Sequence, residues 1–262
     1  MEASLEVRVD GAAGAIPAQS FADILRITLH MLAELDRAEV REGLSMRSWT
    51  LADLRIGSAK AVVRREGTVG TETPDRLVAG IHQLRNVEEL PPFFSAKLAA
   101  QLVRVGRCAS QAGLTGVTYR ASRAGTAGLA ASVTTDVVSN AQASTQAVAP
   151  ALGSVSGVLD IVNLRRGRRV SLYDDETRRA IPCRFLPECL EDVRGALGYR
   201  VRAVGTVTRN RRGQVLRVDA EQVARIPDDG PLPSVADLVG IAPWYTGDLS
   251  TDDYLRWMRD EG

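Results

Sequence analysis

Five short segments between residues 153 and 226 alternate apolar and polar residues, and turn-forming residues separate them. A stretch with helical spacing, residues 187–197, lies between the third segment and the fourth. Each alternating segment is typical of a β-strand with one buried face. The expected strands are residues 153–164, 169–173, 180–185, 199–208 and 214–226. Five strands with one helix between the third and fourth have the element order of an OB-like β-barrel, which is the fold that the sequence predicts for residues 153–226.

Two glycines support closure of this barrel, and a third supports one of its turns. Gly157 and Gly205 interrupt the first and fourth strands, where the strands of a small barrel must bend. The stretch Asn210-Arg-Arg-Gly213 predicts a hairpin turn, with glycine where a positive φ is needed.

The first 112 residues predict an α+β domain in which helices pack on a small sheet. The apolar spacing predicts strands at residues 4–10, 49–56 and 59–64 and helices at residues 21–37, 75–85 and 94–105. Ser20 and Asp23 are expected to cap the first helix. The overall prediction is therefore an α+β chain with the barrel as its second domain.

Residues 113–152 are rich in Ala, Gly, Ser and Thr. Small side chains offer little area to bury, so this stretch is interpreted as a partly mobile connection between the two domains. It is expected to hold one strand at residues 117–120 and another near residues 133–138. A closely packed strand at the edge of a sheet is the alternative.

Charge is divided between segments of opposite sign, although the whole chain has a net charge of only +1. Residues 154–226 hold 15 arginines against nine acidic residues, whereas residues 227–262 hold two arginines against eight. Two turns of the barrel segment hold most of its clustered arginines, namely Arg165, Arg166, Arg168 and Arg169 in one and Arg209, Arg211 and Arg212 in the other. Arginine-bearing loops on such a barrel are one way to bind single-stranded nucleic acid. These arginines are the candidate nucleic-acid-binding residues, and two solvated surfaces without a ligand are the alternative.

Residues 227–262 predict an extended, acidic, partner-docking tail that ends in a short helix. Four of the chain's twelve aromatic residues lie there, in a segment with three prolines before residue 234. Such a segment cannot bury aromatic side chains by itself, so they pack on a partner or back on the barrel. The candidate partner-binding residues are Trp244, Tyr245, Leu249, Tyr254, Arg256, Trp257 and Arg259.

The C-terminal half of the chain resembles a bacterial antitoxin-like family associated with PIN-domain ribonucleases. The resemblance rests on a small β domain followed by the ending DL.GI.P..TG.LS...Y.R..RD. This chain matches that ending at Asp237, Leu238, Gly240, Ile241, Pro243, Thr246, Gly247, Leu249, Ser250, Tyr254, Arg256, Arg259 and Asp260. The resemblance implies a PIN-domain toxin as protein partner, with Arg256 and Arg259 reaching carboxylates of its metal-binding groove. The chain is longer than typical antitoxins and has no recognisable DNA-binding arm at its N-terminus, so any operator binding would fall to the barrel.

No motif of a catalytic site is visible. The sequence lacks GxSxG, HExxH, P-loop and GxGxxG patterns, and His30 and His82 are its only histidines. We therefore expect a protein that is not an enzyme and binds no cofactor or metal. An enzyme in the N-terminal domain, with a pocket around His82, is the alternative.

The three cysteines, Cys108, Cys183 and Cys189, have no metal-ligand spacing. Their odd number, without a signal peptide, indicates reduced thiols in a cytoplasmic protein. No stretch reaches the roughly 18 apolar residues of a membrane helix, so no membrane partner is expected. The sequence leaves a homo-oligomer open.

Overall fold

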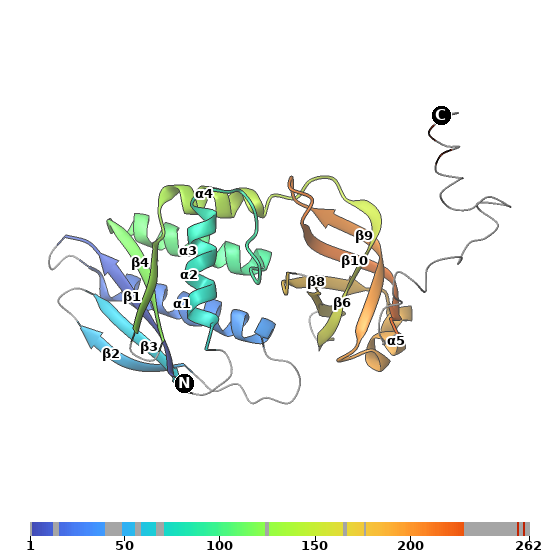
Figure 1. Ribbon diagram of the computed structural model, residues 1–262, viewed down its shortest axis with the longest axis horizontal. Helices are drawn as coiled ribbons and strands as arrows, with labels where there is room; N and C mark the ends of the chain where they lie inside the picture. Colours follow the sequence, from blue (N-terminus) through green and yellow to red (C-terminus); the bar gives the residue numbers. More distant parts are fainter. Residues whose placement is uncertain are drawn as a thin grey trace. The chain divides into compact units, whose positions relative to one another are not determined.

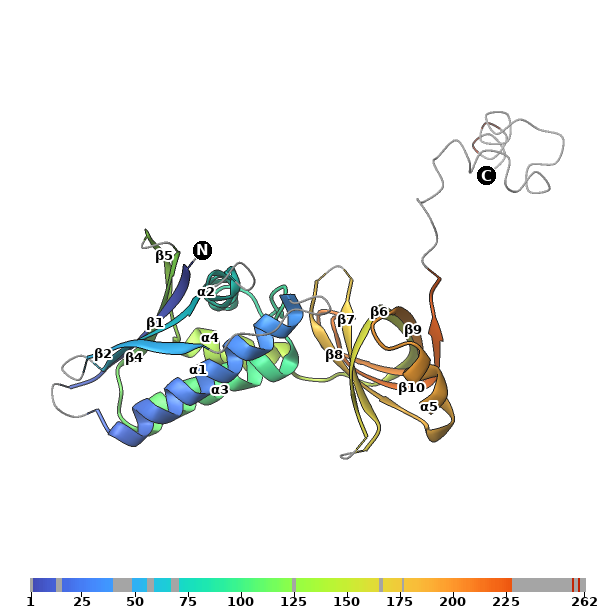
Figure 2. The same cartoon turned by 90° about the horizontal axis from the view of Figure 1, so that it is seen from below.

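The computed structural model describes residues 2–12, 16–39, 49–55, 59–66, 71–123, 126–164, 167–175, 177–227, 256 and 259. The chain divides into two units, residues 1–226 and residues 227–262. Within the first unit, an N-terminal sheet with four helices is followed by a closed β-barrel (Figures 1 and 2). The α+β class and the β-barrel that the sequence predicts are confirmed.

The N-terminal sheet has five antiparallel strands in the order β2-β3-β1-β4-β5. Its strands are β1 (Glu2–Asp10), β2 (Thr50–Arg55), β3 (Lys60–Glu66), β4 (Gly116–Arg123) and β5 (Thr126–Ser132). The three strands predicted before residue 112 are present as β1, β2 and β3. β1 lies at the centre of the sheet, between β3 and β4, and its alternate apolar residues Leu5, Val7 and Val9 are all buried.

Four helices belong to this part of the chain: α1 (Ala18–Glu39), α2 (Thr73–Leu84), α3 (Ala96–Gln111) and α4 (Thr135–Ser144). Their apolar side chains share one buried core with those of the strands. The predicted cap at Ser20 is wrong, because α1 already begins at Ala18 and the Phe21 N–H donates to the Pro17 carbonyl at 3.1 Å. Asp23 accepts hydrogen bonds from Gln19 and Arg26 instead.

The stretch interpreted as a connection holds β4, β5 and α4. The strand expected at residues 117–120 is part of β4, but the one expected near residues 133–138 is wrong. There Thr134 caps α4, and its hydroxyl accepts the Val137 N–H at 3.4 Å. Small residues allow close packing here: a Cβ added at Gly106 of α3 would lie 2.3 Å from Val138 Cγ2 of α4. The composition therefore reflects tight contacts between elements.

The barrel is closed by five strands in the order β10-β8-β7-β6-β9. They are β6 (Ala151–Asn163), β7 (Arg169–Asp174), β8 (Ala180–Phe185), β9 (Arg200–Arg209) and β10 (Val215–Arg225). A 3-10 turn, η2 (Pro187–Cys189), and a short helix, α5 (Leu190–Gly195), connect β8 to β9. Every pairing is antiparallel except that of β10 with β8, which is parallel. The five predicted strands and the helix between the third and fourth are all present.

Gly157 and Gly205 lie where two strands approach each other too closely for a side chain. A Cβ at Gly157 would lie 2.4 Å from the Tyr173 carbonyl oxygen. Gly205 has a φ of +157°, and a Cβ there would lie 2.3 Å from the Asp219 carbonyl oxygen. Gly213 has a φ of +78° in the β9–β10 hairpin, as the sequence predicts.

Candidate nucleic-acid interface

The first arginine-rich turn leads into β7, and the cluster of arginines extends onto the neighbouring strand β8. Arg169, the first residue of β7, lies directly opposite Arg184 of β8, and both side chains are exposed together with that of Arg168. Like charges directly opposite each other destabilise a strand pair. Among the described residues, no carboxylate forms an ion pair with these three arginines, although Asp219 is the neighbour of Arg184 on β10. Asp219 pairs with Arg217 instead, at 3.1 Å. This end of the barrel thus presents concentrated positive charge that is available to an anion.

The second arginine-rich turn is held in place by Asn210, which is buried. Its side-chain oxygen accepts the N–H groups of Arg212 and Gln214, and its amide donates to the Ser144 carbonyl at the end of α4 at 2.8 Å. Gln214 in turn accepts the Leu90 N–H at 2.8 Å. The hairpin backbone is therefore anchored on the N-terminal part of the unit.

The side chains of this second turn point into solvent. Arg209, Arg211 and Arg212 are all exposed, and Arg209 donates to the Gly213 carbonyl within its own hairpin at 3.0 Å. Arg209 therefore also stabilises the turn that presents the other two arginines.

The two turns lie at opposite ends of β6. Ala151, at the start of β6, pairs with Val207 beside the second turn, whereas Asn163, at its end, pairs with Arg169 beside the first. The 13 residues of β6 span at most about 40 Å at roughly 3.3 Å per residue. The structure therefore does not bring the two turns into one patch.

Residues between the two turns were missed by the sequence analysis. Tyr199, whose carbonyl accepts the Leu159 N–H from the middle of β6, is 43% exposed. The Arg225 guanidinium lies 3.3 Å from the centre of the Tyr199 ring. Arg202, on the outward-facing side of β9, is exposed and lies opposite Ser156 of β6. The alternation of apolar and polar residues along β9 could have identified Arg202 as an outward-facing residue. The pairing of Arg169 with Arg184 could not be found in this way, because it depends on how β7 and β8 are aligned.

The other aromatic residues of the barrel are buried. Phe185 belongs to the barrel core and Tyr173 is 8% exposed. Burial raises the pKa of the Tyr173 hydroxyl, and the nearby carboxylates of Asp160 and Glu34 raise it further. Among the described residues of the barrel, Tyr199 is the one exposed aromatic residue, and Arg225 covers one face of its ring.

No protein-family model, curated protein or solved structure matches the chain.

Most of the predicted partner-binding residues lie outside the described residues, namely Trp244, Tyr245, Leu249, Tyr254 and Trp257. Arg165 and Arg166 of the first turn also lie outside them. Arg256 and Arg259 are helical and exposed. The partner-binding role of the tail remains a prediction.

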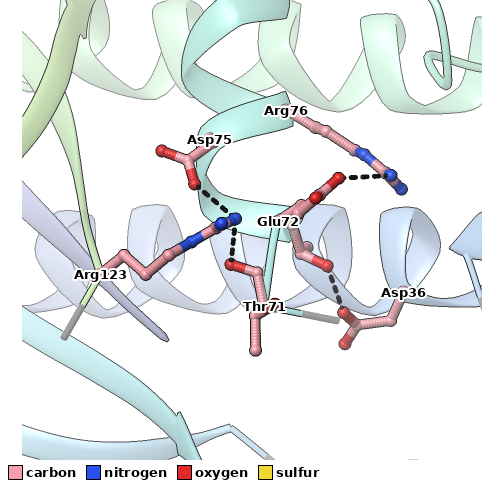
Figure 3. Close-up of polar contacts among 7 residues, drawn as sticks. Asp36, Thr71, Glu72, Asp75, Arg76 and Arg123 are labelled. Atoms are coloured by element: carbon pink, nitrogen blue, oxygen red, sulfur yellow. Dashed lines mark hydrogen bonds and ion pairs between the residues drawn. The ribbon is translucent and has the colours of Figure 1, made fainter. Parts of the chain in front are cut away.

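The polar side chains around the start of α2 form structural pairs (Figure 3). Asp36, which is buried, accepts hydrogen bonds from Thr73 at 2.7 Å and Trp49 at 2.8 Å and pairs with Arg65 at 2.6 Å. Two hydrogen bonds and one ion pair therefore engage one buried carboxylate and tie the end of α1 to β3 and α2.

The same figure shows two ion pairs nearer the surface. Arg76 contacts Glu72 at 2.9 Å, and Arg123 contacts Asp75 at 3.3 Å and donates to the Thr71 carbonyl. Each carboxylate drawn is engaged by an arginine or a hydroxyl. Such pairing is what a structural network requires.

Both histidines have exposed side chains. His82 borders a cavity of about 120 Å³ between α2 and β5, with Arg85 and Ser132 among its other lining residues. Ligand pockets usually enclose about 300–1,000 Å³. Within the described ranges there is no group of three or more His, Cys, Asp or Glu residues that could hold a metal ion. Among the described helices, none is long and apolar enough to cross a membrane.

Proposed function

We propose that this chain is a non-enzymatic, cytoplasmic binding protein whose barrel binds single-stranded nucleic acid. The observation that carries the proposal is the exposed cluster of Arg168, Arg169 and Arg184, which has no carboxylate partner among the described residues. Arginines opposite each other lower the stability of the folded state, so an anion that neutralises them would raise it. Phosphate is an anion that arginine binds well, through two parallel hydrogen bonds.

The barrel's topology supports this function. We class it as OB-like, because its strand order, its parallel third and fifth strands and its helix before the fourth strand are those of that fold. In OB folds, the loop between the first two strands and the loop between the last two flank the nucleic-acid-binding surface. Here those two loops are the arginine-rich turns. We class the N-terminal part as helices packed on a sheet. This part anchors the second of these turns through Ser144 and Leu90.

The distance between the turns suits a single strand. One OB fold binds roughly 4–16 nucleotides. A strand running from Arg168 toward Arg212 would pass Arg202 and Tyr199, which supply a further positive charge and one stacking surface. One exposed aromatic residue gives little base discrimination, so we expect affinity dominated by phosphate contacts.

The test is fluorescence anisotropy with labelled 15-nucleotide dT and rU strands over a range of salt concentrations. The triple variant Arg168→Gln/Arg169→Gln/Arg184→Gln should bind more weakly, with the slope of log K against log salt reduced by about 2. The control is Arg85→Gln/Arg104→Gln/Arg107→Gln, which removes the same charge from exposed positions just after α2 and on α3. Equal losses in both variants would mean that net charge alone governs binding, and the barrel site would be rejected.

We also propose, as a second function, that the tail binds a protein partner in the manner of an antitoxin. The observation that favours it is the concentration of four aromatic and eight acidic residues in residues 227–262. The resemblance of the chain's ending to the antitoxin-like family makes a PIN-domain ribonuclease the expected partner. Affinity purification from the native host, with and without residues 234–262, tests this proposal. A ribonuclease that co-purifies equally with the truncated protein would contradict it.

A further inference from the structure

The barrel carries a second surface of opposite charge. A groove of about 610 Å³ lies between β10 and the segment formed by η2 and α5. Residues 221–225 of β10 form one wall. Cys189, Ala196 and Val223, which are buried, also line the groove. This groove is separate from both arginine-rich turns.

One wall of the groove is a strand edge without a partner strand. The pairing of β10 with β8 ends at Ala220, whereas β10 itself continues to Arg225. On the other side, the Ile226 N–H donates to the Arg200 carbonyl at 2.8 Å, one residue beyond the pair of Arg225 with Val201 that ends the β9 register. Because main-chain groups alternate between the two edges of a strand, Val223 and Arg225 direct theirs away from β9 and toward the groove.

Cys189 already occupies part of this edge. Its thiol donates to the Glu221 carbonyl at 3.2 Å and faces the Val223 N–H. Outside the β9–β10 ladder, no hydrogen bond within the described part of the chain engages the Val223 carbonyl or the Arg225 N–H. An acceptor and a donor therefore remain, spaced as an added strand requires.

The side chains around the groove are acidic. Glu188, Glu191 and Asp192 stand on the helical wall, and Glu221 on the strand wall. Arg194 pairs with Glu191 at 2.8 Å, and Arg225 is stacked on Tyr199. No cation of the described residues pairs with Glu188, Asp192 or Glu221, so three carboxylates surround the free edge.

We propose that this groove binds an extended segment of a partner protein that carries arginine or lysine at alternate positions. The segment adds a strand to β10 through the Val223 carbonyl and the Arg225 N–H. Side chains at alternate positions of a strand point to the same side, so the cationic groups reach Glu188, Asp192 and Glu221 together. This proposal goes beyond nucleic-acid binding and does not depend on it.

The probe is a fluorescein-labelled peptide, Arg-Thr-Arg-Val-Arg-Thr-Arg, measured by anisotropy against the full chain at low salt. The variant Glu188→Gln/Asp192→Asn/Glu221→Gln should bind the peptide about tenfold more weakly, since each lost rim charge contributes modestly. The control Glu88→Gln/Asp136→Asn/Asp160→Asn changes three exposed acids elsewhere and should bind as the wild type does. Equal binding by the groove variant and the wild type would overturn the proposal.

Backbone pairing has its own test, which leaves the protein unchanged. Two versions of the peptide are compared, each N-methylated at one of the two alternating sets of amides. Each version has one edge of its strand blocked and the other edge free. One of the two should lose binding, and the other should retain it. If both bind as the unmodified peptide does, the strand is not added and the proposal fails. The groove variant should bind the dT strand normally, so a failure here is distinguishable from a failure of the nucleic-acid proposal.

Discussion

In the N-terminal sheet and its helices, charged residues near the core are paired with one another, whereas the arginines at the turns of the barrel face solvent. Asp36 and Arg65 form a buried ion pair, and Lys60 pairs with Glu6 across two strands. On the barrel, Arg169 lies opposite Arg184 instead of opposite a carboxylate. The paired charges of the first region tie its elements together, whereas the opposed arginines of the second have no carboxylate partner among the described residues. This contrast supports the proposal that the barrel binds an anionic ligand.

The largest effect should come from breaking the buried ion pair. Asp36→Ala leaves the Arg65 guanidinium buried without its counter-charge and removes the acceptor of Thr73 and Trp49. The free energy of unfolding, measured by urea denaturation, should fall by about 3–5 kcal/mol. The matched control is Asp75→Ala, which breaks the more exposed pair with Arg123 and should cost under about 1 kcal/mol. Similar losses in the two variants would mean that the buried pair has no special role.

The barrel should respond strongly to a side chain at either of its two close strand contacts, of which Gly157 is the one with an ordinary φ. Gly157→Ala would place a Cβ 2.4 Å from the Tyr173 carbonyl oxygen, so backbone must shift. We expect a loss of about 1–3 kcal/mol. Gly153→Ala, on the same strand, meets only the Val207 side chain at 3.5 Å and should be close to neutral. If the two variants are equally stable in thermal unfolding, closure of the barrel does not depend on Gly157.

Local pattern predicted the barrel well because alternation, turn residues and bending glycines all lie within each strand. It predicted β5 and α4 poorly, because small residues give weak periodicity and their packing partners are distant in sequence. Val138, for example, packs against Gly106 of α3. The candidate site shows the same division: the turns were visible in the sequence, but Arg184 is 15 positions from Arg169 and only strand register joins them.

A smaller effect per pH unit is expected from the buried thiol of the barrel core. Burial raises the pKa of Cys183 from 9.0 to about 12. As the pH rises above about 9, the unfolded chain releases the thiol proton while the folded chain keeps it, so stability falls. The free energy of unfolding should decline by at most about 1.4 kcal/mol per pH unit between pH 9 and 12 from this group. Cys183→Ala should show a shallower decline, and identical pH dependence in both proteins would contradict the assignment.

The smallest change in stability, and the most informative one, concerns the opposed arginines. Arg169→Gln/Arg184→Gln removes a repulsion, so the free energy of unfolding should rise by a few tenths of a kcal/mol while nucleic-acid affinity falls. The control Arg200→Gln breaks an ion pair with Asp175 and should lower stability slightly. A variant that gains stability but loses nucleic-acid affinity is the result expected if the two arginines serve binding and not folding. If the double variant loses stability as the Arg200 variant does, the two arginines support the barrel itself, and the contrast between the two regions disappears.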